Sequence, residues 1–317
     1  MTRKAIIGMI RAVALAAALF LAGGAIPVVG GIAMLFAPAP ILIYAVGRSN
    51  PILRGVLSVV LATGLVVLGS GVYGGVTYLL TFGLATAIVC YMLERHFSFE
   101  VITAVAAGAM FAASAVAAVV LLGGPDALIA AMRAQLTEGM QRGQELYKYV
   151  GVDASIPADT QASVVTLTMK LIPALALLVA GVSILFNLRL FWRWTGPQRL
   201  SYSLFADLSR WSTPEWLIWP LLATGFGIFI PIGAASDIAL NGFLVTMAIY
   251  FCQGLAIIRF YFQSLGVPAI VRIVIYFLLA HVVVAALVCI AGVFDMWIDF
   301  RRLKPPSQEA GSFGDFF

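Results

Sequence analysis

A few polar residues interrupt the apolar runs in the carboxyl-terminal third of this sequence. They are Asn241, Gln253 and His281. Polar side chains at membrane depth are energetically costly, so they are functional candidates by default. We therefore predict that these three side chains face a ligand. His281 has two readings: a proton carrier, because the pKa of histidine lies near neutrality, or a neutral side chain hydrogen-bonded across helices.

The densest charged cluster follows at residues 295–302. It contains Asp295, Asp299, Arg301 and Arg302. On a continued helix the two carboxylates share a face, and Arg302 lies three residues beyond Asp299, so i,i+3 and i,i+4 contacts are expected. A metal site would need further ligands. We interpret the cluster as ion pairing at a helix exit; a lipid-modifying enzyme, with these carboxylates as acid and base, is the alternative.

Other chemistry is not indicated. The sequence contains no metal-protease motif, no nucleotide-binding glycine loop and no nucleophile elbow. We expect no enzyme activity, no cofactor and no metal. Arginine and tryptophan interleave over residues 189–219, but an aromatic belt at a membrane surface explains this pattern. Nucleic acid is therefore not an expected partner.

Composition points to lipid as the solvent. Of the 317 residues, 62% are hydrophobic and 10% are charged, whereas a soluble domain is about 25% charged. A soluble protein of this kind would expose large apolar patches and aggregate. The long apolar runs do not alternate with period two, which excludes a barrel and predicts transmembrane helices.

The sequence predicts an all-α, polytopic transmembrane helix bundle over residues 1–300, with eight or nine spans. The candidate spans are 5–23, 26–46, 52–69, 73–93, 101–122, 164–190, 216–234, 238–260 and 270–294. Arginine and lysine gather in alternate connections, which places the amino terminus in the cytoplasm. Nine full spans would leave Arg301, Arg302 and Lys304 outside, against this rule. The count of eight or nine spans therefore depends on whether the last segment crosses fully.

Two regions are expected outside the membrane. Residues 123–163 contain apolar residues at three- and four-residue steps, with charges between them, which predicts an amphipathic helix followed by a loop. It either connects two spans or covers a cavity of the bundle. Residues 301–317 contain prolines, glycines and serines, and we expect a disordered tail.

Small residues at four-residue spacing let helix backbones approach closely in lipid. Ala12 and Ala16 have this spacing, and so do Ala104, Gly108 and Ala112. We expect both sets to pack helices within the chain. The alternative is a surface for a second membrane subunit.

Several motifs resemble the YybS-like family of bacterial membrane proteins, a domain of unknown function. They are Phe36-Ala-Pro-Ala-Pro40, Ser212-Thr-Pro-Glu-Trp216, Asn241…Gln253-Gly254 and Gly292-Val-Phe-Asp295…Asp299-Phe-Arg301. That family is distantly similar to the six-helix S components of energy-coupling-factor vitamin transporters. The resemblance implies that Ala12 and Ala16 face a coupling subunit, although this chain is longer and has extra spans.

These observations favour a transporter-like, small-molecule-binding protein of the bacterial cytoplasmic membrane. The sequence contains no ATPase domain, so active transport would need a partner subunit. The alternative is a non-catalytic scaffold or assembly factor. Loss of ligand binding on substitution of Asn241, Gln253 and His281 would favour the first reading, and a co-purifying membrane protein would favour the second.

Overall fold

The structure is a computed structural model that describes residues 3–26, 29–149, 151, 157–195, 205, 207–230 and 233–302. Every regular element in this part of the chain is a helix, so the all-helical prediction is confirmed. Residues 303–317 of the predicted tail and residues 152–156 of the predicted loop lie outside the described residues. The chain forms two compact units, Met1–Phe205 and Ala206–Phe317, where the sequence predicted one bundle.

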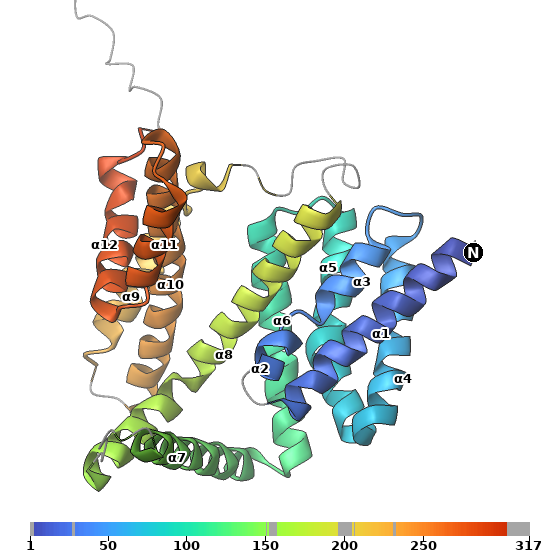
Figure 1. Cartoon of the computed structure of the whole chain (residues 1–317). Coiled ribbons are helices and arrows are strands. Elements are labelled where there is room, and N and C mark those ends of the chain that lie inside the picture. Colours follow the sequence, from blue (N-terminus) through green and yellow to red (C-terminus); the bar gives the residue numbers. More distant parts are fainter. Residues whose placement is uncertain are drawn as a thin grey trace, which may run out of the picture. The chain divides into compact units, whose positions relative to one another are not determined.

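The amino-terminal unit begins with a helix and a broken helix that runs back along it (Figure 1). They are α1 (Arg3–Ala25), α2 (Val29–Met34) and α3 (Pro38–Ala45). A Cβ atom at Gly8 would lie 3.4 Å from the Tyr44 ring, which places the two ends of this hairpin together. The break falls before Pro38 because proline has no backbone N–H to continue the helix.

The next helical stretch folds back on itself at Gly71. It comprises α4 (Pro51–Tyr78), the π-helical turn η1 (Leu79–Gly83) and α5 (Leu84–Glu94). Gly71 has φ 77° and ψ −179°, a conformation that glycine adopts without steric cost. A Cβ atom at Gly55 would lie 2.8 Å from Cys90 Sγ, and one at Gly83 would lie 2.8 Å from Val59. The predicted spans 52–69 and 73–93 are therefore two antiparallel limbs.

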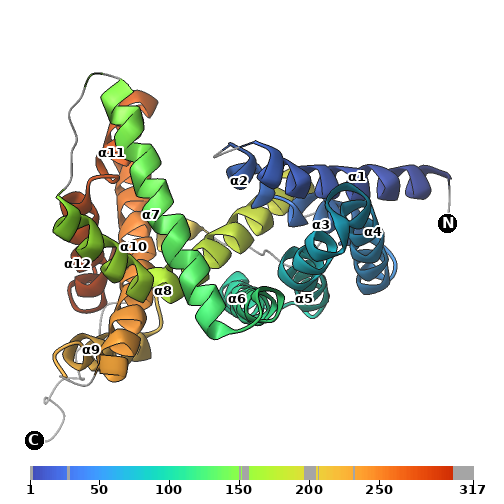
Figure 2. The ribbon, with the colours of Figure 1, turned by 90° about the horizontal axis from the view of Figure 1, so that it is seen from below.

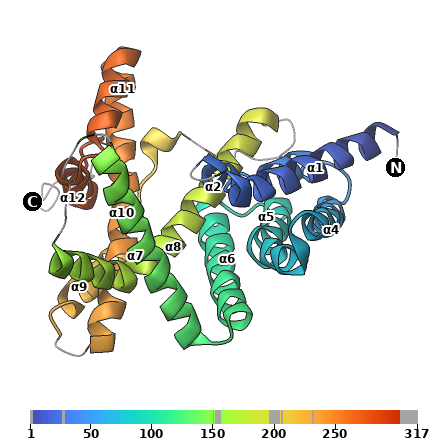
Figure 3. The same ribbon diagram turned by 60° about the horizontal axis from the view of Figure 1, so that its bottom comes forward.

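Three long helices complete this unit: α6 (Phe99–Leu122), α7 (Pro125–Tyr149) and α8 (Ala158–Thr195). α6 ends at Gly123, whose φ of 87° forms a left-handed C-cap. α7 then leaves α6 at a sharp turn (Figures 2 and 3). It contains no buried residue and occupies the position of the amphipathic helix expected within 123–163.

The carboxyl-terminal unit is built around one long helix. Its elements are η3 (Leu208–Arg210), η4 (Glu215–Leu217), α9 (Ile218–Gly227), α10 (Gly233–Ser264), α11 (Ala269–Leu278) and α12 (Val282–Ile298). α9 runs antiparallel to α10, because a Cβ atom at Gly227 would lie 2.8 Å from Ala239 and one at Gly242 would lie 2.7 Å from Thr224. α11 and α12 meet at a bend of 101°.

α12 runs beside α10 in the same direction. Cys289 Sγ lies 3.5 Å from the Met247 carbonyl oxygen, whereas the Tyr261 hydroxyl donates to the Phe300 carbonyl at 2.8 Å. Later residues of one helix thus meet later residues of the other. The carboxyl ends of α10 and α12 consequently lie at the same end of this unit.

Five helices of the described chain are long and apolar enough to cross a membrane, or six if α11 and α12 form one broken span. The five are α1, the folded-back stretch Pro51–Glu94, α6, α8 and α10. The eight or nine spans expected from the sequence included elements that are short or interrupted. Span 26–46 is broken before Pro38, span 216–234 has the ten-residue α9 between η4 and the start of α10, and span 270–294 is bent.

Candidate functional site

Four polar side chains from three segments meet inside the carboxyl-terminal unit. We call Thr213, Gln253, Asp295 and Arg301 the polar cluster; each is at most 6% exposed. They come from the segment before η4, from α10, and from the last turn of α12 with the residues that directly follow it. Beside the cluster lies an apolar core that includes Leu217, Leu221 and Tyr250.

Asp295 is the centre of the polar cluster. Its Oδ2 accepts hydrogen bonds from Arg301 Nη2 at 2.6 Å and from Gln253 Nε2 at 3.1 Å. Its Oδ1 accepts one from the Phe300 backbone N–H at 3.1 Å. Both charges of the ion pair are buried, with side-chain exposures of 3% for Asp295 and 1% for Arg301. Removing one partner of such a pair leaves an uncompensated charge in the interior.

The amide of Gln253 joins Asp295 to Thr213. Gln253 Oε1 accepts hydrogen bonds from the backbone N–H of Thr213 at 3.1 Å and from its hydroxyl. The amide carbonyl therefore faces Thr213 and the amide nitrogen faces the carboxylate. This arrangement connects the segment before η4 to α12 through a side chain of α10.

Arg301 ties the η3 segment to the same cluster. Its Nη1 donates to the carbonyl oxygens of Ser209 and Trp211, both at 2.8 Å. Asp207 Oδ1 in turn accepts from the Ser209 backbone N–H at 3.0 Å and from the Ser209 hydroxyl at 2.7 Å. These hydrogen bonds hold the pKa of Asp207 below its ordinary value. The η3 segment is thus held at both of its ends by side chains.

The end of α12 explains which arginine pairs with Asp295. The helix ends at Ile298, and Asp299 adopts a left-handed conformation with φ 45°. The chain then turns back and places Arg301 against Asp295, whereas Arg302 is exposed. A continued helix would favour contacts three and four residues apart, whereas the buried ion pair at this end of α12 joins residues six apart.

Close backbone packing brings Gln253 and Asp295 within reach of one another. A Cβ atom at Gly292 would lie 2.1 Å from the Tyr250 carbonyl oxygen, and one at Gly254 would lie 2.2 Å from that of Val288. Only glycine fits at either position. Gly254 and Gly292 therefore let α10 and α12 approach closely, as small residues do between helices in lipid.

The other predicted ligand-facing residues do not join the polar cluster. Asn241 lies three helical turns before Gln253, and its Nδ2 donates to the Asp237 carbonyl at 2.7 Å. His281 is exposed and stands at the N-cap of α12, at the bend between α11 and α12. The structure thus brings together Gln253, Asp295 and Arg301 from the predicted residues. Thr213 completes the cluster; it lies in a motif of the sequence but was not predicted as a site residue.

The two small-residue stripes differ in what they contact. Ala12 and Ala16 are 6% and 0% exposed, on the packed face of α1. Ala104 and Ala112 are exposed, and a Cβ atom at Gly108 would meet no atom within 4 Å. The expectation that the second stripe packs helices within the chain is therefore corrected. α6 packs instead through another face, which includes Ile102, Ala106 and Met110.

A second polar contact lies at the break between α2 and α3. The carbonyl oxygen of Leu35 accepts hydrogen bonds from Ser183 Oγ and from Asn187 Nδ2, each at 2.7 Å. Pro38 and Pro40 lack the N–H groups that would continue the helix, and the side chains of α8 supply donors in their place. Ser183 and Asn187 were not predicted as site residues. Two polar residues one turn apart within an apolar span were the available signal.

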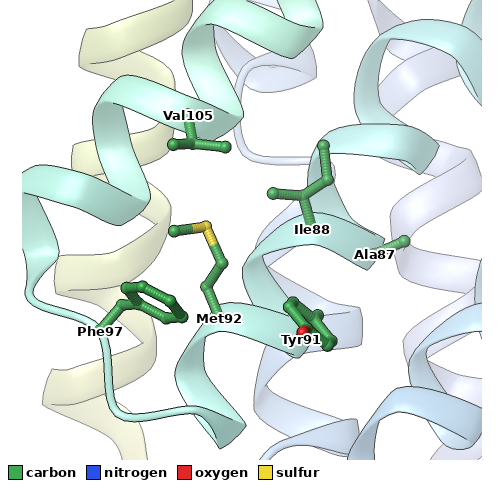
Figure 4. Close-up of a pocket in the computed structure, with 6 residues that line it drawn as sticks. All are labelled: Ala87, Ile88, Tyr91, Met92, Phe97 and Val105. Atoms are coloured by element: carbon green, nitrogen blue, oxygen red, sulfur yellow. The ribbon is translucent and has the colours of Figure 1, made fainter.

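Two apolar grooves flank α6. One, between α5 and α6, has a volume of 470 Å³; it is lined by Ala87, Ile88, Tyr91, Met92, Phe97 and Val105 (Figure 4). The other, of 330 Å³, lies between α6 and α8, with Phe111 and Leu175 among its lining residues. Their linings suit apolar chains. The described residues contain no group of three histidine, cysteine or acidic side chains that could hold a metal ion.

A comparison with protein families agrees with this description. The model of a family described as "Predicted membrane protein (DUF2232)" matches residues 14–296, which is most of the chain. No curated protein and no solved structure matches. The chain belongs to this family of predicted membrane proteins; the YybS-like resemblance and the distant similarity to S components stay predictions.

Proposed function

We propose that this member of the DUF2232 family is a transporter-like subunit of the bacterial cytoplasmic membrane that binds a small polar molecule and is not itself an enzyme. The observation that carries the proposal is the polar cluster. It joins three chain segments through paired polar groups inside an otherwise apolar unit. Charged residues in membrane proteins are expensive and mark functional sites by default.

The cluster has the chemistry to exchange partners with a solute. Well-packed apolar residues are often as stabilising as a buried ion pair, so stability alone does not require Asp295 and Arg301. A solute with both donor and acceptor groups, such as an amino acid or an amide, offers the same hydrogen bonds that the cluster makes internally. Its binding would release the η3 segment from Arg301 and open the unit.

Membrane topology supports a site close to the cytoplasmic surface. We propose a cytoplasmic amino terminus and eight crossings, in which the broken helix α2–α3, both limbs of Pro51–Glu94 and the short α9 each cross. The pair α11–α12 then enters and leaves on the cytoplasmic side. The parallel direction of α10 and α12 supports this arrangement. It also places Arg301 and Arg302 inside, in agreement with the positive-inside rule.

The proposal is tested with the full chain in detergent, by thermal unfolding in the presence of a panel of amino acids, amides and small carboxylates. We expect at least one solute to raise the midpoint of the wild-type chain. The Gln253→Leu variant should lose this shift. Asn241→Leu changes a polar residue of the same helix outside the cluster, so it should retain the shift. A solute that stabilises Gln253→Leu as much as wild type would refute the assignment to this cluster.

A specific feature also favours the alternative of a membrane scaffold. Ala104 and Ala112 are exposed and Gly108 between them is half-buried, so they form a small-residue stripe on α6, a surface suited to a transmembrane helix of another subunit. Gentle purification followed by mass spectrometry tests this reading. A co-purifying membrane protein that is lost in Gly108→Leu would support it, and a monomer with bound lipid alone would count against it.

A further inference from the structure

Two arginines at the connection between α3 and α4 share one aromatic ring. The guanidinium carbon of Arg48 lies 5.1 Å from the centre of the Tyr44 ring, and that of Arg54 lies 6.0 Å from it. The Tyr44 side chain is only 4% exposed, so it forms a fixed base for both cations. Gly8 of α1 packs against the same ring.

Hydrogen bonds fix the orientation of Arg54. Its Nε donates to the Ser49 carbonyl at 2.8 Å, its Nη2 to the Ser49 hydroxyl at 3.3 Å and its Nη1 to the Tyr44 hydroxyl at 3.4 Å. A guanidinium held in this way loses little conformational entropy when it binds a ligand. Arg48, in contrast, is exposed and able to close over a ligand.

The charge of this arginine pair is not neutralised within the described part of the chain. The ion pairs found there are Arg142–Glu138 and Arg301–Asp295; neither Arg48 nor Arg54 pairs with a carboxylate. The amino-terminal end of α4 adds partial positive charge through its aligned peptide dipoles, and the N-cap residue Asn50 makes no side-chain hydrogen bond to its N–H groups. An anion between the two guanidinium groups would offset both charges.

We propose that Arg48 and Arg54 bind the phosphate of an anionic phospholipid headgroup. Guanidinium groups match the geometry of phosphate oxygens and bind them in pairs of hydrogen bonds. In the proposed topology this connection lies between two crossings, the broken helix α2–α3 and the first limb of Pro51–Glu94, so the pair lies at the depth of lipid headgroups. Leu57 and Leu61 lie three and seven residues beyond Arg54 and are 39% and 41% exposed. This strip on α4 lets an acyl chain follow the helix below the headgroup.

The experiment uses the full chain in detergent and native mass spectrometry with dioleoylphosphatidylglycerol and dioleoylphosphatidylcholine. We expect the anionic lipid to bind more tightly than the zwitterionic one by about tenfold, with this preference lost in Arg48→Gln/Arg54→Gln. Arg95→Gln is the matched control, because Arg95 also lies over a tyrosine, 5.6 Å from the Tyr91 ring centre, but without a second arginine on that ring. This variant should keep the preference.

Two additional measurements distinguish a lipid headgroup from free phosphate, and paired hydrogen bonds from charge alone. Inorganic phosphate at millimolar concentration should leave lipid binding unchanged; its displacement of the lipid would reassign the site to free phosphate and overturn the proposal. Arg48→Lys/Arg54→Lys keeps the charge but not the paired hydrogen bonds, so it should retain part of the preference. Equal binding of both lipids to wild type, or an unchanged preference in a folded Arg48→Gln/Arg54→Gln variant, would overturn the proposal as well.

Discussion

The Asp295 carboxylate and the Arg301 guanidinium form an ion pair 2.6 Å long across the end of α12, with both side chains buried. The pair exists because α12 stops at Ile298 and the left-handed Asp299 reverses the chain. The pair links the end of α12 to two other segments. Asp295 accepts a hydrogen bond from the Gln253 amide of α10, and Arg301 donates to the Ser209 carbonyl of η3. Loss of either side chain should therefore disturb the contacts of the other.

Breaking the ion pair should destabilise the protein more than removing it entirely. Asp295→Leu or Arg301→Met alone leaves one buried charge without its partner, at a cost of about 3–5 kcal/mol. The double variant Asp295→Leu/Arg301→Met removes both charges and should recover much of that loss. Thermal unfolding in detergent measures the difference, and Arg302→Met, at an exposed position, serves as control. A double variant less stable than either single one would contradict this account.

The close approach of α10 and α12 should not tolerate a side chain at Gly292. A Cβ atom there would overlap the Tyr250 carbonyl oxygen at 2.1 Å, so Gly292→Ala should separate the helices and weaken the Gln253–Asp295 contact. We expect a loss of about 1–3 kcal/mol, the usual cost of overpacking. Gly108→Ala is the matched control on α6, since its Cβ atom would meet nothing within 4 Å. Equal unfolding midpoints for the two variants would show that the contact is not tight.

The helical, membrane-embedded character of the chain was predictable because it depends on composition and on the length of apolar runs. The ends of α6 illustrate this, since the predicted span 101–122 lies within Phe99–Leu122. The turn at Gly71 was also visible, because this residue lies between the predicted spans 52–69 and 73–93. An apolar run does not show whether its helix is continuous. For this reason the broken α2–α3 and the bent α11–α12 were each predicted as a single span.

The polar cluster was predictable only in part. Gln253 and Asp295 were identifiable as polar residues in apolar surroundings. Their pairing depends on Gly254 and Gly292, which control how closely two helices approach, and on the residue at which α12 ends. Thr213 reaches Gln253 from 40 residues away, and no local pattern encodes such a contact. Helical periodicity predicted contacts three and four residues apart within 295–302, because it assumed a helix that continues past Ile298, and it did not predict the Asp295–Arg301 pair.

Acidification should loosen the η3 segment through Asp207. Hydrogen bonds from Ser209 lower the pKa of this carboxyl group in the folded protein. Its stabilising contribution is therefore present above the pKa of the unfolded chain and is lost as the pH falls through the lower, folded value. Hydrogen exchange of the Ser209 amide should accelerate, relative to the intrinsic rate, at acid pH. Asp207→Asn should remove this pH dependence, and an unchanged profile in that variant would contradict the role of Asp207.

The direction of α12 predicts the side on which the carboxyl terminus lies. Because α10 and α12 run in parallel, residue 302 should lie on the same side of the membrane as residue 264, at the carboxyl end of α10. If the amino terminus lies in the cytoplasm, as proposed, a carboxyl-terminal green fluorescent protein should fluoresce, and a fused alkaline phosphatase should be inactive. Single cysteines at Ser70 and Ser264 provide the internal control. Each is introduced into a variant that lacks Cys90, Cys252 and Cys289. An impermeant maleimide added outside intact cells should label the cysteine at position 70 and should not label the cysteine at position 264. An active phosphatase together with this labelling pattern would show that α11–α12 crosses the membrane as a ninth span.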